Sequence, residues 1–174
     1  MKRQLLLLSI ALLWVFCVSS LQATVTYKLS YNSTTQVYTV SFNSTVAYSG
    51  GLARIAPSSQ ITIVVPDYDA ASPGAFMVTN LTALTGLNWG LTQVNSPVQN
   101  TVRDYLFFAP SNAGSYTPFN IAANTDIDLF SFKASTSCSG TLYLFDNSTD
   151  PLNADLMINS DNNFKVLGAG NVNL

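Results

Sequence analysis

The chain has 174 residues, 48% of them hydrophobic and only 9% charged, with a net charge of −2. It contains neither histidine nor glutamate, two residue types that supply much of the acid–base and metal-binding chemistry of enzymes near neutral pH. This composition argues against an enzyme. The slight acidic excess argues against nucleic acid and anionic membranes as partners, because both require clustered Lys and Arg.

The first 23 residues have the pattern of a secretory signal peptide. Lys2 and Arg3 form a short basic start, an apolar run extends from Leu5 to Val18, and a plausible cleavage site ends at Ala23. The apolar run is shorter than the roughly 20 residues that a membrane-spanning helix needs, so we expect no membrane span after cleavage. We therefore predict a secreted, extracellular or cell-surface protein. Its single mature domain, residues 24–174, has five Lys and Arg against nine Asp, a net charge of −4.

Alternating apolar and polar residues predict a strand at the start of this domain, from Val25 to Tyr31. The polar turn Asn32–Thr35 follows, and a second alternating run, 38–42, completes a hairpin. Further strand-like runs cover residues 61–65, 76–84, 87–91, 105–109, 128–134, 141–145 and 164–167.

Proline residues fall between these runs, and no window after position 23 has a helical period. About nine short strands separated by turns predict an all-β fold, a two-sheet antiparallel β-sandwich. We expect its core to contain Leu29, Val40, Phe42, Ile61, Ile63, Leu106, Phe130, Phe132 and Leu144.

Several of these stretches carry a resemblance to a known family. They are Thr24–Tyr31, Ser59–Pro66, Leu129–Phe132 and Leu144–Asn147, the last followed by Asp150–Pro151. They resemble N-terminal modules of secreted surface proteins of Bacteroidetes, which are similar to the cohesin and carbohydrate-binding-module superfamily. The resemblance implies a cohesin-like jelly roll displayed at the cell surface, and it carries no catalytic residues.

Aromatic side chains that could stack on sugar rings are the candidate ligand-binding residues. Tyr68 and Tyr116 follow polar or loop-like sequence and are the rings that a core needs least, and Tyr48 and Tyr105 are further candidates. Trp89 stands between two leucines in a strand pattern, so a core position competes with a binding role for it.

These residues predict a non-catalytic binding or adhesion module whose partner is a polysaccharide or a surface protein. The alternative is a structural subunit of an extracellular assembly, a homo-oligomer formed through a strand edge or a sheet face.

A cluster of oxygen-bearing side chains near the C-terminal end is the candidate metal site. Calcium takes six to eight oxygen ligands, which Asp, Asn and backbone carbonyls of one loop can supply. The spacing is not that of an EF-hand, and the alternative is that these side chains bind the backbone of their own turns. No other cofactor is expected. The candidate calcium ligands are Asp146, Asn147, Asp150 and Asp155.

Five aspartates, Asp67, Asp69, Asp104, Asp126 and Asp128, could be paired for catalysis. Asp67 and Asp69 lie on one loop next to a proline, and Asp126 and Asp128 lie on one face at the start of a strand. Glycoside hydrolysis needs two carboxyl groups on opposite sides of the scissile bond. With no glutamate and no cluster of tryptophans nearby, we interpret these aspartates as solvated carboxylates at loops and strand edges.

Overall fold

The computed structural model describes residues 24–48, 54–55, 58–67, 76–84, 88–111, 120–134, 141–155, 157–163 and 166–167. The predicted signal peptide lies outside these residues. Within them, no helix is long and apolar enough to cross a bilayer. The strands are β1 (Val25–Asn32), β2 (Val37–Ser44), β3 (Arg54–Ile55), β4 (Ile61–Pro66), β5 (Val78–Ala83), β6 (Trp89–Val94), β7 (Arg103–Pro110), β8 (Asp126–Ala134), β9 (Tyr143–Leu144) and β10 (Val166–Leu167), with a 3₁₀ helix, η1 (Pro151–Ala154), before β10.

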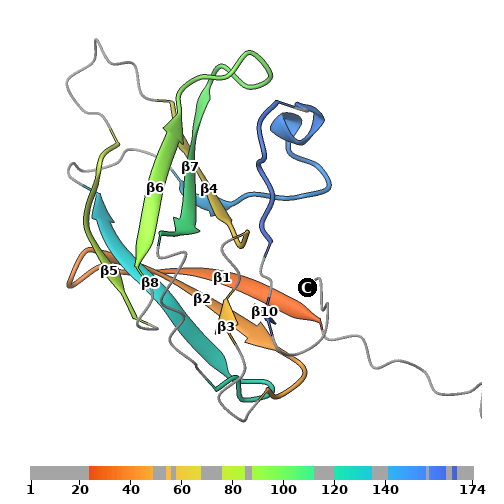
Figure 1. The fold of residues 1–174 in the computed structure, drawn as a ribbon. Coiled ribbons are helices and arrows are strands. Elements are labelled where there is room, and N and C mark those ends of the chain that lie inside the picture. The colour runs from red at the N-terminus through yellow and green to blue at the C-terminus, as the bar shows by residue number, and fades with distance from the viewer. Residues whose placement is uncertain are drawn as a thin grey trace, which may run out of the picture.

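The strands form two four-stranded antiparallel sheets, which confirms the predicted all-β sandwich. The first sheet has the order β1-β2-β8-β5 and the second the order β6-β7-β4-β9, while β3 and β10 make a short separate pair. Figure 1 shows β1, β2 and β8 side by side in one sheet and β6, β7 and β4 in the other. Each run predicted from the sequence overlaps an observed strand, and β3 and η1 were not predicted.

The core between the sheets consists of the inward-facing residues of both. Leu29 and Leu144 are only partly buried, because they lie on the edge strands β1 and β9. The other predicted core residues are fully buried: Val40, Phe42, Ile61, Ile63, Leu106, Phe130 and Phe132.

Six aromatic rings form a continuous row through this core, which we call the aromatic row. The distances between ring centroids are 4.5 Å for Tyr31–Tyr38, 5.3 Å for Tyr38–Phe132, 5.4 Å for Phe132–Phe108, 4.6 Å for Phe108–Phe130 and 4.7 Å for Phe130–Trp89. Aromatic pairs at such distances add to stability beyond the area that they bury. The row joins the two sheets, because Phe108 and Trp89 belong to the second sheet and the other four rings to the first.

The two central strands of the second sheet are buried on both faces. Residues 61–65 of β4 and 104–108 of β7 are all buried. Their outer face packs on the segment after β9 in a second apolar cluster of Val64, Tyr105, Phe107, Phe145 and Leu152. Strands covered on both faces have continuous apolar runs, which explains why these two lack the alternation of β1.

Candidate functional site

An open groove with a volume of about 520 Å³ lies beside the edge strand β6. Its residues on β6 and β7 include two directly paired sets, Gly90 with Ala109 and Thr92 with Phe107. Side chains alternate along a strand, and Trp89, Leu106 and Phe108 belong to the core between the sheets. The groove therefore lies on the outer face of the second sheet.

Every described residue that lines this groove is uncharged. The lining residues are Gln60, Gly90, Leu91, Thr92, Val94, Phe107, Ala109, Pro110, Ser111, Met157, Ile158 and Asn159. Val94 and Ile158 pack at the margin of the second apolar cluster, so the segment that covers β4 and β7 also forms one side of the groove. Amide and hydroxyl groups beside an apolar surface suit a ligand that is polar and carries no charge.

Neither the backbone conformation nor the packing requires a glycine at position 90, which lines the groove. A Cβ atom added there would lie 3.6 Å from the Cβ of Ser111 and 3.8 Å from the carbonyl oxygen of Ala109, which are ordinary contacts. Its φ also lies outside the left-handed range. A glycine inside a strand weakens the strand and often marks a place where a ligand comes close to the backbone.

None of the described aromatic residues that were predicted to bind a ligand lines the groove. Trp89 is 7% exposed and is the last ring of the aromatic row, so it lies in the core. Tyr48 is half-buried, and its backbone N–H and C=O both pair with Ile121 at 2.8 and 2.9 Å. Tyr68 and Tyr116 lie outside the described residues.

Tyr105 is fully buried beneath η1. Its hydroxyl donates to Oδ1 of Asp150 at 2.8 Å and accepts from Nδ2 of Asn100 at 2.9 Å. Burial, together with the hydrogen bond to Asp150, raises the pKa of this tyrosine well above its usual value. Its ring packs edge-on against Phe145, so Tyr105 has a structural role.

Two tyrosines outside the predicted set have exposed rings, Tyr31 at 52% and Tyr143 at 38%. The guanidinium of Arg103 lies over the ring of Tyr143, 5.6 Å from its centroid. Tyr31 continues the alternation of Val25, Tyr27 and Leu29, so the sequence pattern places it on the side of β1 that faces the core. Alternation identifies the face on which a side chain lies, and it does not show where the facing sheet ends.

Hydrogen bonds from the loop itself and from other segments occupy the candidate calcium ligands. Asp146 accepts from the N–H and Oγ of Ser148 at 2.8 and 2.6 Å and from Oγ1 of Thr149 at 2.7 Å. These bonds, the one from the Ser148 hydroxyl first, lower the pKa of Asp146 to about 2. Asn147 uses both side-chain atoms on the backbone of Asn162, at 3.0 and 2.8 Å.

The other two candidate ligands are also engaged. Asp150 caps η1 by accepting from the N–H of Leu152 at 2.9 Å. Asp155 accepts from Nε2 of Gln99 at 2.7 Å and from the N–H of Met157 at 2.8 Å. In the part of the chain that the structure describes, no three Asp, Cys, Glu or His side chains are grouped closely enough to hold a metal. The hydrogen bonds favour the alternative stated from the sequence, in which these side chains bind nearby backbone groups, over a calcium site.

Calcium titration tests this loop directly. An ion that binds only the folded chain raises the melting temperature by mass action. Because these carboxylates already accept hydrogen bonds from protein groups, we expect the same melting temperature in millimolar calcium and in excess chelator. A rise with calcium that the chelator reverses would show instead that the loop rearranges around the ion.

None of the described aspartates considered for hydrolysis is among the residues that line the groove. Asp104 is fully buried and accepts from the N–H of Ser96 at 2.8 Å. Asp67 accepts from the hydroxyl of the same serine. Asp69 lies outside the described residues, and Asp128 is exposed opposite Ser41 of β2. The contacts of Asp67 and Asp104 hold the turn before β7 in place.

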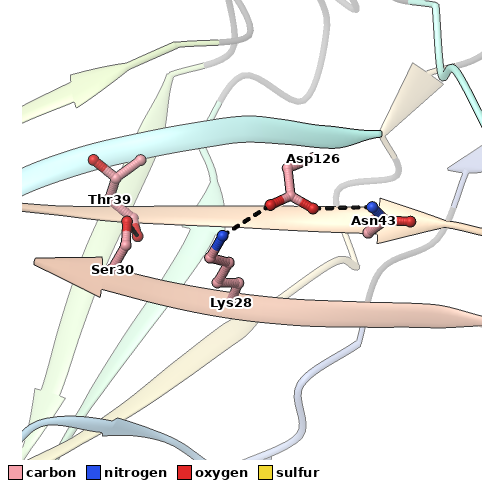
Figure 2. Close-up of polar contacts among 5 residues, drawn as sticks. All are labelled: Lys28, Ser30, Thr39, Asn43 and Asp126. Carbon is pink, nitrogen blue, oxygen red and sulfur yellow. Dashed lines mark hydrogen bonds and ion pairs between the residues drawn. The ribbon is translucent and has the colours of Figure 1, made fainter. Parts of the chain in front are cut away.

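Asp126 joins the three neighbouring strands on the outer face of the first sheet (Figure 2). It accepts from Nδ2 of Asn43 at 2.9 Å and forms an ion pair with Lys28 at 3.0 Å. The bond from Asn43 and then that from Lys28 lower the pKa of Asp126. Both charged side chains are exposed, so the pair adds little to stability. A lysine on the edge strand β1 also opposes pairing with another chain.

Comparison of the chain with protein-family models, curated proteins and solved structures found no match.

Proposed function

We propose that this protein is a non-catalytic binding module, secreted or held at the cell surface, that recognises an uncharged carbohydrate chain in the groove beside β6. The observation that carries the proposal is the groove itself, with its uncharged lining and the glycine at Gly90. The signal-peptide pattern supports a location outside the cell. The cohesin-like jelly-roll topology implied by the sequence resemblance belongs to the same proposal.

The chemistry of the lining fits a neutral sugar. Sugar rings have hydroxyl groups around their edge and C–H groups on their faces, so they need hydrogen-bonding groups beside an apolar surface. Thr92 supplies a hydroxyl and Asn159 an amide, and Val94 and Ala109 supply apolar surface. The amide nitrogen of Gln60 is already bound to the carbonyl oxygens of Asn159 and Asp161, at 2.7 and 3.3 Å. The volume of about 520 Å³ lies within the range of small-molecule sites.

Gly90→Val is the variant that tests this function. The valine side chain would fill the groove next to Ser111, so we expect carbohydrate binding to be lost. Valine suits a strand better than glycine, so the free energy of unfolding should stay the same or rise by about 0.5–1 kcal/mol. Binding is measured by isothermal titration with neutral oligosaccharides, and unfolding by urea denaturation.

The matched control is Thr26→Val, which adds the same side chain on an exposed position of β1 in the other sheet. This control should bind as the wild type does. Wild-type affinity in Gly90→Val would contradict the groove as the site. Tyr68 and Tyr116 remain proposed ligand contacts, and their alanine variants belong in the same assay.

The second proposed function is that of a structural subunit. In the described part of the chain, β6 has a strand partner on one side only, and Leu91 on this edge is 37% exposed. An open edge of this kind can pair with a second copy. Mass photometry at rising protein concentration tests this function, which predicts growing oligomers.

A further inference from the structure

The ring of Tyr31 has an unusual position for an exposed aromatic side chain. Tyr31 is 52% exposed, and its ring centroid lies 4.5 Å from that of Tyr38, the residue directly opposite on β2. Tyr38 in turn stacks on Phe132, which is fully buried. The exposed ring is therefore the outer end of the aromatic row that extends to Trp89.

This support holds the ring in place before any ligand arrives. A side chain that is free to rotate loses conformational entropy when it binds, and a side chain already held by packing loses less. The other exposed tyrosine ring, that of Tyr143, has the Arg103 guanidinium over it. Among the described aromatic residues, Tyr31 thus combines the greatest exposure with a rigid support.

The turn next to Tyr31 presents hydroxyl and amide groups and no charge. Residues 33–36, Ser-Thr-Thr-Gln, are all exposed. The side chain of Asn32 fixes the turn by accepting from the N–H groups of Thr34 and Thr35 at 3.0 and 3.1 Å. Gln36 has a φ of 55°, a left-handed conformation that is usual at the end of such hairpin loops.

We propose that Tyr31 and the 33–36 turn form a second carbohydrate contact, in which a neutral pyranose ring stacks on the tyrosine while the turn side chains bind its hydroxyls. This inference rests on the proposed carbohydrate ligand and uses a surface separate from the residues that line the groove. The competing explanation is that Tyr31 stabilises the hairpin through its pair with Tyr38 and binds nothing.

Residue-resolved NMR separates the two surfaces. Isotope-labelled protein is titrated with soluble neutral oligosaccharides (cellohexaose, xylohexaose and mannohexaose). We expect saturable shifts of the Tyr31 ring and of the 33–36 amides with at least one of these sugars. Shifts of Thr92 and Ala109 report on the groove in the same spectra, so each surface is judged independently.

Tyr31→Val keeps a good strand residue and removes the ring, and we expect it to weaken binding at the turn about tenfold. It should leave any shifts of Thr92 and Ala109 unchanged. Leu29→Val trims a partly buried side chain of the same strand, keeps the ring, and should bind as the wild type does.

Shifts that disappear in Tyr31→Val and persist in Leu29→Val support the second contact. Three outcomes overturn it: shifts at the groove alone, shifts at the turn that persist in Tyr31→Val, or no shift anywhere. The last outcome also contradicts the proposed carbohydrate ligand. Shifts at the turn alone keep that ligand and contradict only the groove as its binding site.

Discussion

Replacing Trp89 by alanine is expected to lower the free energy of unfolding by about 3–5 kcal/mol, the usual cost of removing a large buried aromatic ring. The side chain is 7% exposed and lies 4.7 Å from the ring of Phe130 across the two sheets. Its removal would leave a cavity at the inner end of the aromatic row. Urea denaturation measures the change, and an unchanged m-value would show that the folded and unfolded states keep their compactness.

Trp89→Phe is the matched control. The indole N–H has no hydrogen-bond partner among the described residues, so losing it removes no hydrogen bond there. Phenylalanine also keeps a ring against Phe130, and we expect this variant to lose about 1–2 kcal/mol. If Trp89→Ala unfolded like the wild type while losing carbohydrate binding, the ring would belong to a binding site and its assignment to the core would be wrong.

Replacing Asn162 by alanine is expected to lower the free energy of unfolding by about 2–4 kcal/mol. This side chain is 7% exposed, accepts from the N–H of Thr62 at 2.7 Å and donates to the carbonyl of Phe145 at 2.7 Å. Both residues are buried, so alanine would leave two backbone groups without a partner in a place that water reaches poorly. Denaturant unfolding is again the measurement.

Two further variants show whether burial is the cause. Asn162→Asp keeps the acceptor for Thr62 and loses the donor to Phe145, so it should also be strongly destabilised. Asn32→Ala removes two hydrogen bonds, of 3.0 and 3.1 Å, from the N–H groups of the exposed residues Thr34 and Thr35, where water can replace them, and should lose far less. Equal losses in Asn32→Ala and Asn162→Ala would contradict this explanation.

The hairpin of β1 and β2 was predictable because apolar residues lie on the side of each strand that faces the core and polar residues on the other side. That arrangement produces the alternation seen from Val25 to Tyr31 and again after the turn. The strands β4 and β7 were predictable from their apolar runs, but nothing in these runs identified what covers their outer face. The covering segment is rich in Asn and Asp, and its apolar contribution is only a few residues, among them Phe145 and Leu152.

The candidate sites were harder to predict because they depend on where covering segments end. Gly90 belongs to no sequence motif. Only the structure makes it a candidate site residue, because it lies beside an open groove with room for a side chain. Tyr31 fits the buried side of β1 by alternation and is nevertheless exposed. The Asp and Asn cluster from Asp146 to Asp155 suggested calcium by composition, whereas its hydrogen bonds depend on three-dimensional partners such as Gln99 and Asn162.

The central claim is that this sandwich binds an uncharged carbohydrate in the groove beside β6, and a glycan array probed with the wild-type protein and with Gly90→Val tests it most directly. We expect the wild type to bind one or more neutral glycans and Gly90→Val to bind none of them, although both proteins are folded. Binding to charged glycans alone, or equal binding by the two proteins, would contradict the claim. Binding to no glycan by the wild type would also contradict it, and oligomers that grow with concentration would then favour the structural subunit.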